Sequence, residues 1–553
     1  MIRLFEQHKI RKENELEGLW NFTTADENHS YKLSVPGCWE QHPRLSAYRG
    51  KGIYTKIVSI SEPGAVRLEF KGVSHTADVY FDGVHIAHHY NAYTPFHSIV
   101  KDVSVGDHEI KVIVDNTFGE HSSLHVPNDY YTYGGIIRPV SFAGISETYI
   151  EKLHFTPTLE NGVWNGLLKV TIYNLSSKAK TIKLVGTLDN IELNFETIEV
   201  PEDSHITVSL KQQFPEAIAW SHENPKLYTL NTVLYSNNLP VDDLIERVGF
   251  RTIQIDRKNI LLNGEKVFLK GFNRHEDYAT VGCAIPFQLM LTDMDLMEDM
   301  GVNALRTCHY PNDERFLDLC DEKGIMVWEE NHARGLELPA MLNPNFDRQC
   351  RDCIDEMIDN HYNHPSIIIW GILNECGSET EEGRIKYKAQ YEQIKELDDT
   401  RPTTSATCKH FKDICLDLPD IVSYNIYSGW YEDVPVKMRN DKELEWINST
   451  PGAGKPMIVS EFGGAAMYGY RDRTHCKWSE ERQADILEEC LSVYMTDENI
   501  SGVFIWQFAD CRITEEGMYS KTRPRCHNNK GVVDDYRRPK MAYDTVKKFF
   551  HGL

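Results

Sequence analysis

The stretch Ile367-Ile-Ile-Trp-Gly-Ile-Leu-Asn-Glu375 is an almost unbroken run of apolar residues that ends in a carboxylate. A short apolar run of this kind is typical of a strand that is buried on both faces, as in a parallel sheet covered by helices. A second stretch, Met457-Ile-Val-Ser-Glu-Phe-Gly463, has the same form and also carries a glutamate near its end. Each stretch therefore predicts a buried strand with a polar residue at its carboxyl end.

The chain from about residue 251 to its end alternates strand and helix patterns of this kind. Helical patterns fall at Asp293–Met300, Glu314–Lys323 and Ser479–Thr496, among others. The predicted strands are Leu269–His275, Ala304–His309, Ile325–Glu330, Ile367–Glu375, Thr403–Thr407, Ile421–Tyr427, Met457–Phe462 and Val503–Phe508. Eight strand–helix units in this order and length indicate a TIM barrel, and the alternative is a doubly wound open sheet.

Polar residues follow nearly all of these predicted strands, which favours the barrel. The active sites of TIM barrels are built at the carboxyl ends of the strands. The residues concerned are His275, His309, Glu330, Glu375, Tyr427, Glu461 and Asp510. We therefore expect one shared site at this face.

The first 250 residues have a different pattern. Residues 1–145 contain period-2 segments such as Val66–Phe70 and Glu109–Val114, separated by turn signals, and predict a jelly-roll sandwich of the sugar-binding type. Residues 146–250 contain similar segments such as Leu168–Tyr173 and predict an immunoglobulin-like β-sandwich. With a barrel over 251–553, the chain is expected to form three domains, since 553 residues exceed what one core supports.

Composition excludes several classes of function. A formal net charge of −24 argues against a nucleic-acid partner, and the lack of a long apolar run argues against a membrane span. The start of the chain has no apolar segment typical of a signal peptide, and the thirteen cysteines lack the spacing of a disulfide framework. We therefore expect a cytoplasmic protein. A homo-oligomer is a separate expectation that these features do not test.

No pattern in the chain predicts a cofactor. Cys350 and Cys353 lie in a charged helical stretch without a second Cys-x-x-Cys, which is typical of helix cysteines rather than of a metal site. His275 and His309 have no metal-binding spacing, and no Gly-x-Gly-x-x-Gly follows a strand. We therefore expect neither a metal nor a nucleotide cofactor.

Glu375 and Glu461 together suggest glycoside hydrolysis. That reaction needs one carboxylic acid to protonate the leaving oxygen and one carboxylate at the anomeric carbon. A carboxyl group at the end of an apolar strand is partly desolvated, which raises its pKa as a general acid requires. A single such glutamate is more often a salt-bridge partner or a helix cap. Two of them, on the fourth and seventh strands of one barrel, favour catalysis.

Several motifs in order resemble glycoside hydrolase family 2 over essentially the whole chain. They are Leu269-Lys-Gly-Phe-Asn-Arg-His-Glu276, Asn303-Ala-Leu-Arg-Thr-Cys-His-Tyr-Pro311, Asn374-Glu375 and Ser460-Glu-Phe-Gly463. The resemblance implies a retaining exo-β-glycosidase with Glu375 as acid/base and Glu461 as nucleophile. It also implies that Asn374 binds the sugar 2-hydroxyl, that Tyr427 contacts the nucleophile and that Trp506 forms the apolar floor. For His275 and His309, sugar-hydroxyl contacts or core packing are the expected roles.

The motif Asn528-Asn-Lys-Gly531 resembles the pattern with which the β-glucuronidases of this family hold the substrate carboxylate. Lys530 and Asn528 are both hydrogen-bond donors that a uronate oxygen can accept from. The resemblance also implies that Tyr431 helps to hold the carboxylate and that Asp129 reaches a sugar hydroxyl from the first domain. Arg523 and Arg525 add positive charge nearby. The alternative to uronate recognition is that this segment is a solvated basic loop.

Three functions stay open, and β-hexuronide hydrolysis is the first, with glucuronide ahead of galacturonide. Arg334 follows the third strand, where a guanidinium can reach the sugar carboxylate or an axial C4 hydroxyl as in galacturonides. A β-galactosidase would leave Lys530 without a role. A carbohydrate-binding protein on an inactive barrel usually lacks a catalytic carboxylate, and both are present. The short segment 331–363 predicts a site open on the leaving-group side.

Overall fold

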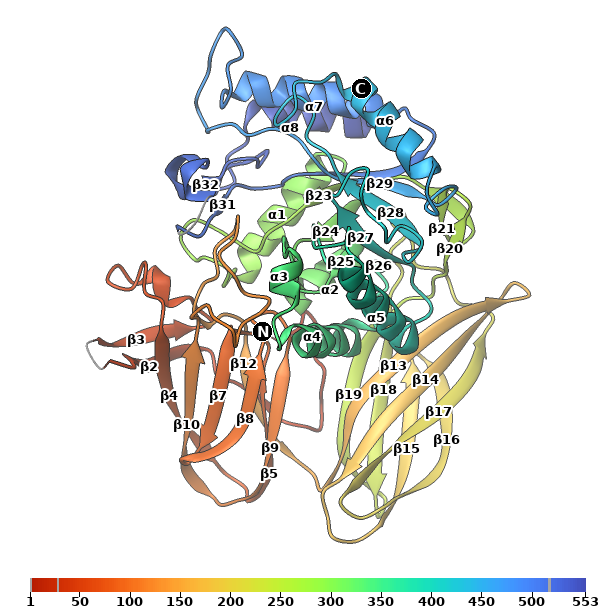
Figure 1. Cartoon of the computed structure of the whole chain (residues 1–553). Coiled ribbons are helices and arrows are strands. Elements are labelled where there is room, and N and C mark those ends of the chain that lie inside the picture. Colours follow the sequence, from red (N-terminus) through yellow and green to blue (C-terminus); the bar gives the residue numbers. More distant parts are fainter. Residues whose placement is uncertain (1, 27–28, 516–518) are drawn as a thin grey trace.

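The computed structural model describes residues 2–26, 29–515 and 519–553. Figure 1 shows two β-rich regions side by side and a helix-rich region packed across their upper ends. The first β-rich region is drawn in red and orange, and the second in yellow. The green and blue part of the chain forms the third region.

The first region is a sandwich of two antiparallel sheets. Alternate residues of its strands are buried, as in Val66, Leu68 and Phe70, so one face of each sheet forms the core. The strand orders are β1-β12-β5-β9 and β3-β2-β4-β10-β7-β8, with a small ribbon of β11 and β6. The strands are β1 (Glu13–Glu15), β2 (Gly18–Thr24), β3 (Ser30–Val35), β4 (Lys51–Ile60), β5 (Gly64–Phe70), β6 (Val73–Ser74), β7 (Thr76–Phe81), β8 (Val84–Tyr90), β9 (Phe96–Val103), β10 (Gly106–Asp115), β11 (Gly135–Ile136) and β12 (Val140–Ile145), with the short helix η1 (Trp39–Gln41).

The second region is a smaller sandwich with the sheets β13-β14-β17 and β16-β15-β18-β19. A three-stranded antiparallel sheet then leads into the third region. The strands are β13 (Thr148–Glu160), β14 (Val163–Asn174), β15 (Lys180–Leu188), β16 (Ile191–Val200), β17 (Ser204–Phe214), β18 (Tyr228–Ser236), β19 (Leu239–Val248), β20 (Ile253–Asp256), β21 (Asn259–Leu262) and β22 (Glu265–Val267).

The third region is a closed parallel barrel of eight strands, so the open-sheet alternative is excluded. The barrel strands are β23 (Leu269–Asn273), β24 (Ala304–Thr307), β25 (Met326–Glu330), β26 (Ile367–Ile372), β27 (Thr403–Thr407), β28 (Ile421–Asn425), β29 (Met457–Phe462) and β30 (Ile500–Ile505). The helices are α1 (Phe287–Asp299), α2 (Glu314–Lys323), α3 (Leu338–Met341), α4 (Phe346–His361), α5 (Glu381–Leu397), α6 (Val436–Asn448), α7 (Glu480–Tyr494) and α8 (Met541–His551). Every predicted barrel strand overlaps an observed one.

Several strands end earlier than the sequence predicts, and the reason is local. The prediction extends the fourth strand to Glu375, whereas β26 ends at Ile372. Leu373 and Glu375 have φ angles of 38° and 53°, which turn the chain out of the sheet. Glu375 therefore lies on the first turn beyond β26, whereas Glu330 and Glu461 lie in the last residues of β25 and β29.

A long segment after β30 crosses this mouth and meets the first region. It contains β31 (Cys511–Arg512), η2 (Tyr519–Lys521), η3 (Pro524–Cys526) and β32 (His527–Asn528). Figure 1 shows loops of the first region, in orange, rising toward β31 and β32. The Arg523 guanidinium bonds the Asp129 carboxylate across this junction. Within the described ranges, no helix is long and apolar enough to cross a membrane.

Candidate active site

A cavity of about 310 Å³ opens at the carboxyl face of the barrel. Both strand-end glutamates line it, together with residues from four barrel loops and from the first region. The lining residues are Asp129, Arg334, Glu375, Cys408, His410, Asn425, Tyr427, Tyr431, Glu432, Glu461, Trp506, Tyr519, Arg523 and Lys530. Eight of the thirteen residues predicted for the site are among them.

Glu461 is held as a carboxylate by two donors. Its side chain is 3% exposed, and the Arg306 guanidinium and the Tyr427 hydroxyl donate to its two oxygens at 3.0 and 2.7 Å. Burial raises the pKa of Glu461 to about 7, and the neighbouring charge of Glu375 acts in the same direction. The guanidinium of Arg306 opposes this shift of the pKa. The two cavity carboxylates are therefore coupled electrostatically.

Glu375 lies at a strained position of the backbone. Its φ of 53° is in the left-handed region, which costs a non-glycine residue about 1–3 kcal/mol and persists only where the surroundings enforce it. The Asn425 amide donates to its Oε1 at 2.8 Å, and Arg334 Nη2 lies 3.8 Å from its Oε2. The neighbouring Asn374 has a buried Nδ2 without a partner in the described chain. That amide is free to donate to a ligand.

Arg306 connects these groups, although no role is predicted for it from the sequence. It lies fully buried in β24 and donates to Glu330, Glu461 and Asn374. A charged residue inside a short buried strand is rare unless it is paired. That exception to the apolar pattern of Ala304-Leu-Arg-Thr307 is the signal that identifies Arg306 in the sequence.

Another part of the cavity wall carries positive charge. Lys530 is 3% exposed, and its ammonium donates to the Tyr431 hydroxyl at 2.9 Å. Arg523 donates to the same hydroxyl at 3.1 Å. Although burial opposes it, Lys530 and Arg523 hold the pKa of Tyr431 below its ordinary value. In the part of the chain that the structure describes, no carboxylate lies within ion-pair distance of Lys530.

Asp129 brings the first region into the site. Its carboxylate accepts from Arg523 Nε and Nη2 at 2.9 and 2.6 Å and from Asn528 Nδ2 at 3.0 Å. Asn528 is therefore bonded to Asp129 and lies behind the cavity wall. Arg525, which was expected to add charge to the site, is exposed and does not line the cavity. Arg523, for which the same role was expected, lines the cavity.

His275 and His309 lie beneath Trp506, which forms part of the cavity wall. The ring of His309 stacks on Trp506 with centroids 5.1 Å apart, and His275 meets Trp506 edge to face at 5.4 Å. Burial, with the charges of Arg334 and Arg306, lowers the pKa of His275 to about 3, so its ring is neutral near pH 7. Burial also lowers the pKa of His309. Both rings are therefore neutral donors and acceptors.

Two parts of the chain match descriptions of one known family. Residues 253–553 match "Glycosyl hydrolases family 2, TIM barrel domain", and residues 148–251 match "Glycosyl hydrolases family 2".

Solved structures and curated proteins agree with these matches. The chain is 49% identical to a family 2 β-galacturonidase from Eisenbergiella tayi, solved with galacturonate, with a TM-score of 0.97 over 100% of this chain and 99% of that one. A β-D-glucuronidase structure from Dictyoglomus thermophilum is 26% identical, with a TM-score of 0.86 over 100% and 99% of the two chains. A β-glucuronidase of Streptococcus agalactiae is 27% identical over 98% of this chain and 96% of its own.

Two carboxylates in one cavity at a barrel mouth are the arrangement that glycoside hydrolysis requires. The closed barrel, the two preceding β-regions and both family matches agree with that chemistry. The chain therefore belongs to glycosyl hydrolase family 2 and is a β-glucuronidase-like glycoside hydrolase.

Proposed function

We propose that the chain is a retaining exo-β-hexuronidase. The observation that carries this proposal is the Lys530 ammonium, which is 3% exposed, faces the cavity and has no carboxylate partner among the described residues. A buried charge is costly unless it is paired. A substrate carboxylate would supply the missing charge, whereas a neutral hexoside would not.

The proposed mechanism is a double displacement. The Glu461 carboxylate attacks the anomeric carbon while Glu375 gives its proton to the leaving oxygen, which forms a covalent glycosyl-enzyme. Glu375 then takes a proton from water, and that water displaces Glu461 from the sugar. Donation to Glu461 from Arg306 and Tyr427 supports its role as the ionised partner.

A β-galacturonide is the first candidate substrate, which reverses the order expected from the sequence. Arg334 lines the cavity and lies 3.8 Å from Glu375. There its guanidinium can donate a hydrogen bond to an axial C4 hydroxyl or to the carboxylate of the sugar. The similarity to the Eisenbergiella tayi β-galacturonidase supports the same choice. A β-glucuronide is the second candidate, supported by the Asn528-Asn-Lys-Gly531 motif and the β-glucuronidase relatives.

The cavity volume supports an exo mode of action. About 310 Å³ is at the lower end of the range of small-ligand sites, and Asp129, Arg523 and Lys530 line this cavity together with the carboxylate pair. A single sugar with its carboxylate against Lys530 fits this shape. The cytoplasmic location and the homo-oligomeric state stay predictions.

Turnover of three 4-nitrophenyl glycosides tests the proposal: β-galacturonide, β-glucuronide and β-galactoside. We expect both uronides to be hydrolysed well above the galactoside, and the galacturonide fastest. Proton NMR of the first product should show the β-anomer, as retention requires. Faster turnover of the galactoside would contradict the uronide assignment, and initial release of the α-anomer would contradict the mechanism.

A further inference from the structure

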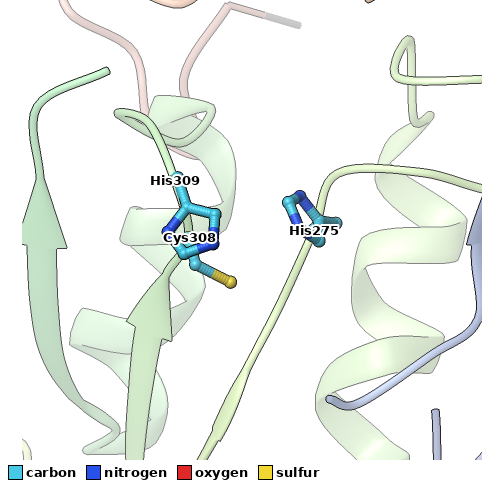
Figure 2. Close-up of side chains that lie close together, drawn as sticks. All are labelled: His275, Cys308 and His309. Carbon is cyan, nitrogen blue, oxygen red and sulfur yellow. The ribbon is translucent and has the colours of Figure 1, made fainter. Parts of the chain in front are cut away.

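A cluster of side chains that can bind a metal ion lies beneath the cavity. The proposed hydrolysis uses no metal ion at this cluster. His275, Cys308 and His309 each offer one ligand atom, and these atoms lie within 4.8 Å of one another. Figure 2 shows the three side chains converging from two neighbouring segments, with the Cys308 sulfur directed toward His275. All three are buried.

The two histidines already have the hydrogen bonds that orient metal ligands. His309 Nδ1 is bonded to the Glu330 carboxylate at 2.8 Å, and His275 Nδ1 to the Tyr310 hydroxyl at 3.2 Å. In known metal sites the second ring nitrogen is held in this way by a carboxylate or another polar group. The Nε2 atom of each ring is buried and has no hydrogen-bond partner in the described chain.

From these contacts we infer that His275, Cys308 and His309 form a binding site for a thiophilic divalent cation of the zinc class, which inhibits the enzyme. Zinc takes histidine nitrogen at about 2.0–2.1 Å and cysteine sulfur at about 2.3 Å, in tetrahedral geometry. Ligand atoms already within 4.8 Å of one another reach those distances through small side-chain movements. Binding would release the thiol proton of Cys308 to solvent.

Glu461 can complete the coordination. Its Oε1 lies 3.9 Å from His309 Nε2, and a carboxylate is a good fourth ligand for zinc. The charges also balance: the carboxylates of Glu330 and Glu461 and a Cys308 thiolate offset the Arg306 guanidinium and a divalent cation. A cation held there would remove Glu461 from catalysis. Inhibition should therefore be competitive with substrate.

The first experiment titrates zinc chloride into the purified enzyme during turnover of the best 4-nitrophenyl glycoside. We expect a rise in KM with unchanged kcat, reversed by a chelator. Cys308→Ser should keep the hydrolytic activity and lose more than about tenfold in zinc affinity, because even outer-shell groups contribute 10- to 100-fold. Cys408→Ser, which alters a thiol on the cavity wall, is the matched control and should keep the zinc inhibition. Equal inhibition of the parent and Cys308→Ser would overturn the inference.

A second measurement does not depend on activity. Cobalt(II) bound to the intact enzyme should give a thiolate-to-cobalt charge-transfer band in the near ultraviolet, and an excess of sugar acid product should displace the ion. A cobalt complex without that band, or no zinc binding in calorimetry, would overturn the site even if Cys308→Ser fails to fold. The proposed uronide function fails separately, through the turnover of the three glycosides.

Discussion

Two parts of the cavity wall are built from different kinds of structure. In one part, Glu375 follows β26 and Glu461 lies in β29, and side chains from other strands hold them, chiefly Arg306 and Asn425. In the other part, Lys530 and Arg523 lie on the segment after β30, and Asp129 comes from the first β-region. The comparison suggests that the rigid barrel carries the bond-breaking chemistry, while the loops carry the choice of sugar.

This division predicts that substitution of either carboxylate of the pair lowers the turnover of uronides and hexosides alike. Glu461→Gln should lower kcat by about 10⁴- to 10⁶-fold on uronides and hexosides alike, as removal of a nucleophile does in other enzymes. Single-turnover kinetics on both sugars would measure the loss. Glu432→Gln removes another cavity-lining carboxylate and is the control that should keep most of the activity. A loss confined to uronides would contradict the division.

The second largest effect should depend on the leaving group. Glu375→Gln removes the proposed proton donor, so turnover of an alkyl uronide should fall by about 10²- to 10⁴-fold. A 4-nitrophenyl uronide should lose much less in the step that forms the glycosyl-enzyme, since nitrophenolate leaves without protonation. Rates for a series of aryl and alkyl leaving groups would test this. A uniform loss across the series would mean that Glu375 is not the acid.

The pH dependence sharpens the roles of the two glutamates. Burial and the neighbouring charge of Glu375 raise the pKa of Glu461 to about 7. Arg306 and Tyr427 both donate to Glu461 and favour its ionised form, which the proposed attack on the anomeric carbon requires.

It follows that kcat/KM should rise about tenfold per pH unit below about 7 and level off above it, since the proposed nucleophile acts as a carboxylate. A pH profile of the parent enzyme on a nitrophenyl uronide would check it, with Glu432→Gln as the control that should keep the same profile. Activity that falls as pH rises toward 7 would contradict the role of Glu461 as nucleophile.

The smallest effect on activity is expected from a change at Tyr431, which contacts Lys530 and Arg523. Its hydroxyl accepts from Lys530 and Arg523, so Tyr431→Phe loses a contact that positions both cations. Loss of a hydrogen bond worth about 0.5–1.5 kcal/mol should lower kcat/KM on a uronide by about 2- to 12-fold. The value for a neutral hexoside should hardly change. Equal losses on both sugars would mean that Tyr431 contributes to the turnover of every substrate and not to recognition of the uronate.

The carboxylate pair at the barrel strands could be predicted from the sequence better than the cations on the segment after β30, for physical reasons. Glu375 follows an apolar strand and Glu461 lies near the end of another, and the barrel fixes the burial and direction of both strands, so the sequence pattern alone places the two glutamates at one face. Arg306 was missed because a single charge inside an apolar strand does not change the strand pattern. Its partners can be named only once the barrel has closed.

The cavity residues that lie on loops were harder to predict. Arg523 and Arg525 are two residues apart, yet Arg523 lines the cavity and Arg525 is exposed. Arg525 has a φ of 61°, so the chain turns between them and no regular period relates their side chains. Similarly, Cys408, His410 and Tyr519 line the cavity from loops whose paths depend on tertiary packing.

The Lys530→Ala variant tests the uronide assignment most directly, through the ratio of kcat/KM on a β-galacturonide to that on the matching β-galactoside. Removing the buried ammonium leaves the sugar carboxylate unpaired, at a cost of roughly 2–5 kcal/mol. We expect the ratio to fall by about 30- to 5,000-fold relative to the parent, by the rule of tenfold per 1.36 kcal/mol. Arg525→Ala, which removes an exposed cation from the same segment, should leave the ratio unchanged. Equal losses on the two sugars after Lys530→Ala would contradict recognition of a uronate by this lysine.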